Sequence, residues 1–136
     1  VANAESGVID LTVTSVSANP SSVLRSTSTT VTVTVHNDGL VPISQPPGSP
    51  VTVKLTDVTT NKVIGTQTFT SLAAGASQSF NYTYSNISSP IGNHTLEGFV
   101  DSDNVVIETN ENNNKKNRTI TVNNNPPSTS ISSYVA

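Results

Sequence analysis

Valine alternates strictly with threonine over residues 30–35, within the segment 29–37, and this alternation limits the folds open to the chain more than any other feature of its sequence. Neighbouring side chains of an extended strand point to opposite faces, so Val31, Val33 and Val35 share one face and the threonines share the other. A helix would instead repeat its apolar residues every three or four positions, and no stretch of the sequence has that period. The pattern therefore predicts an all-β protein with almost no helix.

Six further segments have the composition and alternation of strands. They are residues 8–17, 51–57, 62–70, 78–85, 93–100 and 118–122. The first of these slips its phase at Val16, which predicts a bulge, and the third is interrupted at Gly65. The proline-rich stretch 40–50 is predicted to be a loop without strand pairing, and 71–77 a connection of small residues. Seven strands separated by turns predict a seven-stranded immunoglobulin-like β-sandwich of two packed sheets.

The composition gives this domain an uncharged polar surface. Serine (20), threonine (20) and asparagine (16) are abundant, whereas charged residues make up only 11% of the chain, against about 25% in an average protein. With six Lys and Arg residues and a net charge of −3, the chain has no basic stripe for nucleic acid, and no apolar run is long enough for membrane insertion. The absence of cysteine excludes disulfides and thiolate metal sites. Such a surface favours an extracellular or cell-surface location, for which we expect the chain in its mature form, without a signal peptide.

Four stretches, in this order, resemble one known family. They are DLTVTSVSANPSSV, TTVTVTVHNDGLVPIS, SLAAGASQSFNYTY and, over residues 101–114, DSDNVVIETNENNN. Together they resemble CARDB, the cell-adhesion-related domain of bacteria and archaea, over residues 8–124. The resemblance implies a seven-stranded sandwich carried by secreted and surface proteins, usually as one module of several. Residues 1–7 are then an N-terminal extension and residues 125–136 a C-terminal tail. A single copy with short tails is not expected to be a spacer in a long modular protein.

The acidic and amide-rich stretch that begins at residue 101 offers oxygen ligands of the kind that Ca²⁺ prefers. The candidate ligands are Asp101, Asp103 and Glu108. An EF-hand-type loop that begins at Asp101 would need glycine at its sixth position and glutamate at its twelfth, but Val106 and Asn112 stand there. We therefore interpret the stretch as a hairpin connection whose Asp and Asn side chains bond the local backbone, with calcium as the less favoured alternative.

The sequence predicts no catalytic site. His36 lies on the outward side of its strand and His94 shares the parity of Leu96, and two histidines without a third ligand at a fixed spacing do not make a zinc site. The serines lie in no Gly-x-Ser-x-Gly or other nucleophile motif. We therefore expect a protein that is not an enzyme and that needs no cofactor.

The asparagines carry two signals. Four of them begin an Asn-x-Ser/Thr sequon and are candidate glycosylation sites in an archaeal or eukaryotic source: Asn81, Asn86, Asn93 and Asn117. About four sequons are expected from this composition alone, so their number is no evidence. None of the 16 asparagines precedes Gly, Ser or Thr, the arrangement most prone to chemical damage. This avoidance indicates selection for a long-lived or heat-exposed chain.

Two functions remain open for such a domain. The first is a structural subunit of an extracellular filament or surface assembly built from copies of this chain. The second is a non-catalytic adhesion or carbohydrate-binding module that attaches to surface glycans. Sugar platforms usually present aromatic rings, but tryptophan is absent and the alternating aromatic residues of strand 78–85 are predicted to be core. Phe69, Phe99 and Tyr134 are left as candidates for such a platform.

The filament hypothesis rests on the C-terminal tail. Pro126 and Pro127 cannot continue a paired central strand, because proline lacks the N–H donor. The segment STSISSYVA that follows is uncharged and competent to form a strand, with Thr129, Ile131, Ser133, Tyr134 and Val135 as candidate contact residues. We predict that it leaves its own domain and completes a neighbour's sheet as a donor strand. Folding back onto its own sheet is the alternative, and the N-terminal segment 1–8 is the second choice of donor.

Overall fold

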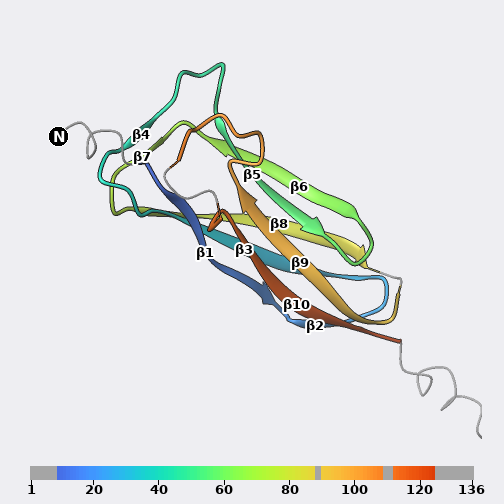
Figure 1. The fold of residues 1–136 in the computed structure, drawn as a ribbon. Helices are drawn as coiled ribbons and strands as arrows, with labels where there is room; N and C mark the ends of the chain where they lie inside the picture. Colours follow the sequence, from blue (N-terminus) through green and yellow to red (C-terminus); the bar gives the residue numbers. More distant parts are fainter. Residues whose placement is uncertain (1–8, 88–89, 109–111, 125–136) are drawn as a thin grey trace, which may run out of the picture.

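The computed structural model describes residues 9–87, 90–108 and 112–124, and its fold is all-β (Figure 1). Seven longer strands carry the fold: β1 (Leu11–Asn19), β3 (Thr27–Asn37), β5 (Val51–Asp57), β6 (Lys62–Phe69), β8 (Ser77–Ile87), β9 (Gly92–Val100) and β10 (Lys115–Asn123). Three short strands are β2 (Ser22–Leu24), β4 (Ile43–Ser44) and β7 (Ser71–Leu72). The seven predicted strands are thus confirmed, whereas the expectations for segments 1–7 and 125–136 lie outside the described residues. Within the described part of the chain, no helix is long and apolar enough to cross a membrane.

Two sheets pack face to face to form an immunoglobulin-like sandwich, as predicted. Strands β1, β3 and β8 form a three-stranded sheet, which we call sheet A. Strands β2, β10, β9, β5 and β6, in that order, form the five-stranded sheet B. The long strands pair antiparallel, whereas the short β2 runs parallel to β10. The two sheets therefore differ in their number of strands.

The alternation in β3 separates the core from the surface. Val31, Val33 and Val35 are fully buried, while the polar residues between them remain partly exposed. In β1, the register of pairing with β3 shifts between Val13 and Ser15. This confirms the bulge predicted from the phase slip, because one extra residue returns the following valine to the core side.

The prediction that residues 40–50 form no strand pairing is wrong, because β4 pairs with β7. Pro42 and Pro46 lie on either side of β4 and not within it, so both residues of this short strand keep their N–H groups. Ile43 and Leu72, which face each other across the pair, are buried. The apolar pair is the physical reason for this small sheet, since it covers one end of the core.

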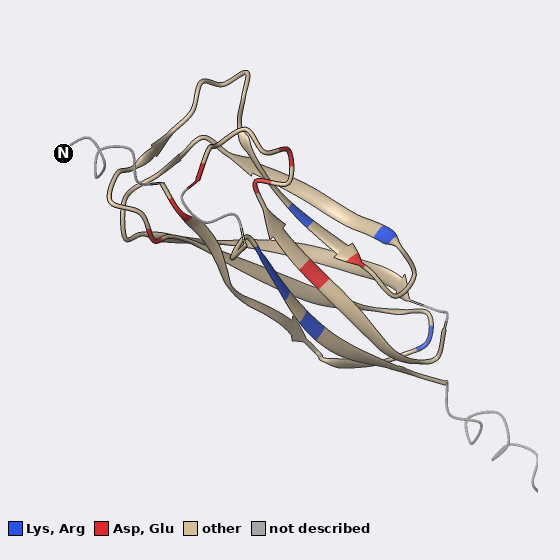
Figure 2. Cartoon of the chain, viewed as in Figure 1, with Lys and Arg blue, Asp and Glu red and all other residues tan. Residues whose placement is uncertain are grey.

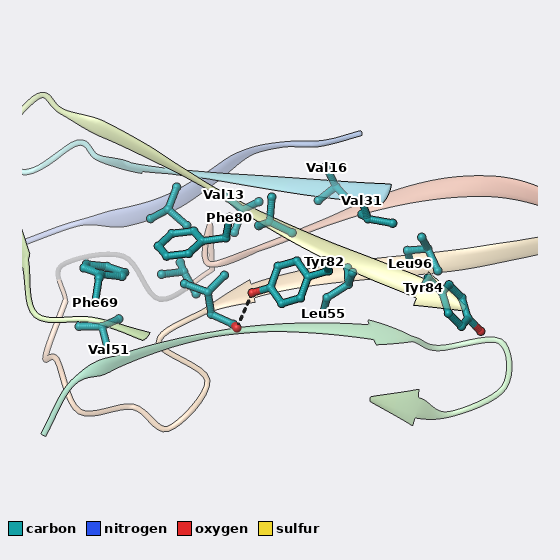
Figure 3. Close-up of a cluster of buried hydrophobic side chains, with 14 of the residues drawn as sticks. Val13, Val16, Val31, Val51, Leu55, Phe69, Phe80, Tyr82, Tyr84 and Leu96 are labelled. Atoms are coloured by element: carbon teal, nitrogen blue, oxygen red, sulfur yellow. Dashed lines mark hydrogen bonds between the residues drawn. The ribbon is translucent and has the colours of Figure 1, made fainter. Parts of the chain in front are cut away.

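Aromatic side chains of β8 fill the core between the sheets (Figure 3). Phe80, Tyr82 and Tyr84 are buried, as their alternation predicts. The hydroxyl of Tyr82 donates a hydrogen bond of 2.6 Å to the carbonyl of Val53 and so ties sheet A to β5 of sheet B. Phe69 is also buried, with its ring centroid 5.8 Å from that of Phe80. Phe69 therefore cannot serve in a surface sugar platform, which corrects the sequence-based expectation.

Two strand glycines lie close to core side chains of the opposite sheet. A Cβ on Gly98 of β9 would lie 3.0 Å from methyl groups of Val16 and Val33 in sheet A. A Cβ on Gly65 of β6 would lie 3.2 Å from the ring of Tyr82. The β5–β6 register also shifts beside Gly65, in agreement with the predicted interruption of this strand. Both glycines thus admit bulky core side chains from the opposite sheet.

Candidate functional site

The carboxylate of Asp101 bonds to the backbone of the connection between β9 and β10, to which this residue belongs. Asp101 follows the last residue of β9 with a φ of 59°, a left-handed conformation that Asp and Asn tolerate better than most residues. Its two carboxylate oxygens accept hydrogen bonds from the backbone N–H groups of Val105 (2.8 Å) and Val106 (3.1 Å). This is the local backbone bonding expected of a hairpin connection.

Asp103 and Glu108 bind other parts of the fold. Asp103 accepts a hydrogen bond of 2.8 Å from the hydroxyl of Thr52 on β5. Glu108 accepts one from the backbone N–H of Leu11 at 3.0 Å and another from the amide of Asn114 at 2.8 Å. In residues 9–87, 90–108 and 112–124, no three Asp, Glu or His side chains gather into a group that could hold a metal ion. Calcium binding by the three carboxylates stays the less favoured alternative, and no observation here tests it.

An open hollow lies beside this connection. Its volume is about 370 Å³, and it is lined by Phe99, Asp101, Ser102, Asn104 and Lys115. The ammonium of Lys115 lies 4.6 Å from the centroid of the Phe99 ring, in cation–π contact. Phe99 is partly exposed, unlike the buried Phe69, whereas Tyr134, the remaining candidate for sugar contact, lies outside the described residues. An aromatic ring beside amide, carboxylate and ammonium groups provides both stacking and hydrogen bonding for a polar ring-shaped ligand.

The four sequon asparagines are exposed, and they come from different faces. Asn81 of β8 accepts a hydrogen bond of 2.7 Å from Thr32 on the outer face of sheet A. Asn93 of β9 accepts one of 3.1 Å from Thr121, and Asn86 has a left-handed φ of 55°. Asn117 lies on β10. Their exposure leaves each accessible to a modifying enzyme, and glycosylation stays a prediction.

A buried polar cluster joins three strands, and the sequence analysis did not anticipate its central residue. Asp57 at the end of β5 accepts hydrogen bonds from the hydroxyl of Tyr84 (2.5 Å) and from Nδ1 of His94 (2.6 Å). His94 is fully buried, and its Nε2 lies 2.6 Å from the carbonyl oxygen of Pro90. Both partners of the ring are acceptors, so His94 donates to each only when both of its nitrogens carry a proton. Parity was the missed signal, because Asp57 continues the buried alternation of Val51, Val53 and Leu55.

The charge state of this cluster follows from its hydrogen bonds. Burial alone would raise the pKa of the Asp57 carboxyl, but the hydrogen bonds from His94 and Tyr84 outweigh it and hold that pKa below its usual value. Burial, reinforced by the neighbouring Asp57, raises the pKa of the Tyr84 hydroxyl. The carboxylate is therefore ionised and the phenol neutral near pH 7. The cluster links β8 of sheet A to β5 and β9 of sheet B, which is a structural role.

The outer edge of β8 is a sheet edge that the fold leaves unpaired within the described residues. In the constant-type immunoglobulin sandwich, the fourth strand pairs beside the fifth and gives that sheet four strands. Here the corresponding strand, β6, pairs with β5 instead, so β8 is the last strand of sheet A. The backbone carbonyl of Asn81 on this edge accepts a hydrogen bond of 2.5 Å from the side chain of Gln67, and Lys62 lies over the ring of Tyr84. Side chains, not a paired strand, therefore meet β8 here within the described residues.

The sequence profile of the CARDB family matches residues 8–118. The chain belongs to the CARDB family. CARDB domains are related to the cell surface and to adhesion, and the family is not a catalytic one. This agrees with the resemblance seen in the sequence and with the sandwich described above.

Solved CARDB structures share the fold. The crystal structure of a CARDB domain from Pyrococcus furiosus, in complex with di-metal ions, aligns with a TM-score of 0.68 and 23% identity over 85% of this chain and 89% of that one. A domain from Methanosarcina acetivorans, described as part of a cell-surface protein, aligns with a TM-score of 0.66 and 28% identity over 85% of this chain and 92% of that one. No curated protein sequence matches the chain.

Proposed function

We propose that this protein is a structural subunit of an extracellular filament, in which the tail of one copy adds a strand to the sandwich of the next. The observation that carries the proposal is the unpaired outer edge of β8 in a sheet of only three strands. An open edge presents N–H and C=O groups that an incoming strand can pair with, and natural proteins seldom leave a long one unprotected. β8 has 11 residues, enough to pair with the whole of segment 128–136.

The chemistry of the edge suits such a strand. The carbonyl of Asn81 points away from β3 and is satisfied by one flexible glutamine side chain. The N–H and C=O of a strand residue point to the same side, so Ser79, Asn81 and Thr83 share this outward orientation. On the neighbouring β6, Val63 leaves 52% of its surface exposed. A donor strand would replace the glutamine contact with main-chain hydrogen bonds, and the parity of Ile131 and Val135 would supply apolar cover.

Donation between copies propagates, whereas folding back does not. In its own domain, a tail that leaves β10 in sheet B would have to cross to sheet A to reach the outer edge of β8. Donation to a neighbour avoids this crossing. A contact of this head-to-tail kind is heterologous, so it extends into a fibre unless the rotation between subunits closes a ring.

Two variants test the proposal by negative-stain electron microscopy of the purified chain. Deletion of residues 126–136 should leave a folded domain that forms no fibres. Asn81→Pro should also abolish fibres, because it removes an outward N–H of β8 without removing a donor to β3, whereas Asn81→Ala keeps that N–H and should assemble normally. Fibres of normal repeat from the deletion variant would refute donation by the tail. A deletion variant that melts far lower, with no change in assembly, would instead indicate folding back.

A second candidate function is glycan binding at the hollow beside Phe99. The observation that favours it is the partly exposed aromatic ring beside amide and carboxylate groups in a space of about 370 Å³. A glycan array with the wild-type chain and the Phe99→Ala variant tests this candidate. Binding that is lost in Phe99→Ala but kept in Thr68→Ala, on the exposed surface of β6, would support it, and equal binding by both variants would exclude this hollow.

Our proposal assigns this chain no metal ions like those in the structure of the Pyrococcus furiosus domain. Asp101, Asp103 and Glu108 each accept hydrogen bonds from N–H or O–H donors of the fold, and no three Asp, Glu or His side chains of the described residues gather into a ligand group. The residues present therefore do not fit a preformed metal site, and we derive no role for a metal.

A further inference from the structure

The charges of this protein are segregated between its two sheets (Figure 2). None of the residues in β1, β3 and β8, the three strands of sheet A, is Asp, Glu, Lys or Arg. The strands of sheet B carry Lys54, Asp57, Lys62, Glu97, Lys115, Lys116 and Arg118. A soluble surface normally intersperses both signs of charge, so a sheet face without Asp, Glu, Lys or Arg is a departure that needs a physical reason.

The polar groups of this face bond to one another. Where β3 pairs with β8, three directly opposed side-chain pairs are joined across the strands. They are Thr32 with Asn81 (2.7 Å), Thr34 with Ser79 (2.9 Å) and His36 with Ser77 (2.8 Å). On the other side, the hydroxyl of Thr14 on β1 donates to the carbonyl of Thr34 at 3.3 Å. Hydrogen-bonding groups that already have protein partners lose less when water is removed, so covering this face costs less than covering an ordinary polar surface.

The area of the face decides how it can be used. Three strands spaced about 4.8 Å apart, with nine residues at about 3.3 Å each, present roughly 400 Å². Two such faces together would bury about 800 Å², which is less than the roughly 1,200 Å² of a stable pairwise interface. One contact is therefore too small to hold two free subunits together. The same contact repeated along two fibres becomes strong, because each link holds the next in place.

We propose that the charge-free outer face of sheet A is the surface through which filaments of this protein pair side by side, each copy against a copy in the neighbouring filament. This inference rests on the proposed filament function, and it adds the surface through which one filament contacts the next. A face without charge has no self-repulsion, so it can meet an identical face. The aromatic residues of β8 point inward to the core and leave no stacking platform for a polysaccharide on this side, which favours a second copy as the occupant.

The test places a charge at the centre of the face. Thr34 lies on the middle strand of sheet A and bonds to both of its neighbours. Thr34→Lys should assemble into single filaments that no longer bundle, and Thr34→Glu should do the same. The matched control is Thr56→Lys, on β5, an inner strand of sheet B, which should bundle as the wild type does. The protein is produced without glycosylation, because a glycan on Asn81 would stand on this same face.

Electron microscopy and light scattering at low and high salt provide the readout. Wild-type bundles should persist at high salt, since no charges form the contact. Filaments of Thr34→Lys mixed with those of Thr34→Glu should bundle again, which a contact through a polysaccharide would not produce. Bundling by Thr34→Lys at the wild-type level, or wild-type filaments that never bundle, would overturn this inference and leave the filament itself intact. Absence of filaments would overturn both proposals.

Discussion

Asp57 is fully buried, and four hydrogen-bond donors surround its carboxylate. Besides Tyr84 and His94, the backbone N–H groups of Thr59 (3.0 Å) and Thr60 (3.3 Å) donate to it. Asp57→Asn removes the charge that these donors share and replaces one acceptor oxygen with an NH₂ group, which cannot accept a hydrogen bond from them. We expect the free energy of unfolding to fall by roughly 3 kcal/mol at pH 7, measured by urea denaturation.

The exposed Asp38 provides the control for this substitution. Asp38→Asn should change the free energy of unfolding by less than about 0.5 kcal/mol, since its side chain is 65% exposed. A loss of stability in Asp57→Asn no larger than in Asp38→Asn would contradict the account of the cluster.

The same carboxylate makes stability depend on pH in the acid range. Its pKa is lower in the folded than in the unfolded state, where the usual value is 3.8. Its contribution is therefore complete above pH 3.8 and is lost as pH falls through the folded-state pKa, because the unfolded chain then binds the proton more readily. Denaturation series from pH 7 to pH 2 should show the gap between wild type and Asp57→Asn narrowing below pH 3.8. A gap of constant size would be inconsistent with an ionised carboxylate in the cluster.

Gly98 tests the closeness of the two sheets. Gly98→Ala puts a methyl group 3.0 Å from Val16 and Val33, and such overpacking should cost about 1–3 kcal/mol of stability. Gly48→Ala is the matched control, because no atom lies within 4 Å of the added Cβ. Thermal melts of the two variants should separate clearly, and equal melting temperatures would show that the sheets can part without cost.

Among the elements, the β9–β10 connection is predicted to need no metal. Asp101 bonds two N–H groups of its own loop, so Asp101→Ala should lower the free energy of unfolding by about 2 kcal/mol. Asp101→Asn keeps a side-chain oxygen and tolerates the left-handed φ, so its loss should be smaller. Excess chelator should leave the wild-type melting temperature unchanged. A fall of several degrees on chelation would instead make Asp101, Asp103 and Glu108 metal ligands.

The strands could be predicted from sequence because apolar and polar residues alternate along a strand that has one buried and one exposed face. Even the bulge in β1 was visible, since it shifts the parity of Val16. The pairing of β4 with β7 was hidden, because a strand of two residues is too short to alternate. The partner of β6 was hidden for another reason: alternation shows which face is buried and does not show which strand lies beside it.

Among the candidate sites too, contacts between residues close in sequence were predictable, and contacts between distant residues were not. The bonding of Asp101 to its own loop follows from local Asp and Asn chemistry and was predictable. The cluster of Asp57, Tyr84 and His94 joins residues far apart in the chain, and only their parity hinted at burial. The free edge of β8 is a property of sheet membership and became visible only in the folded structure.

At the scale of the whole molecule, the outer edge of β8 and the charge-free face of sheet A point in different directions. The edge along β8 is open to a partner that lies in the plane of the sheet. The charge-free face is open to a partner that approaches perpendicular to that plane. Growth by strand donation and pairing by face contact therefore use different surfaces. A subunit can take part in both at once, which is the geometry that a bundle of filaments requires.

The central claim is that segment 126–136 pairs with the outer edge of β8, and amide hydrogen exchange tests it directly. Isotope-labelled chain truncated after residue 125 is mixed with a synthetic peptide of residues 126–136, and exchange is followed by NMR. The account predicts strong slowing at the outward amides of Ser79, Asn81 and Thr83, because an added strand would pair with them. Slowing at the edge of β6 or β2 instead, or no slowing at saturating peptide, would contradict it.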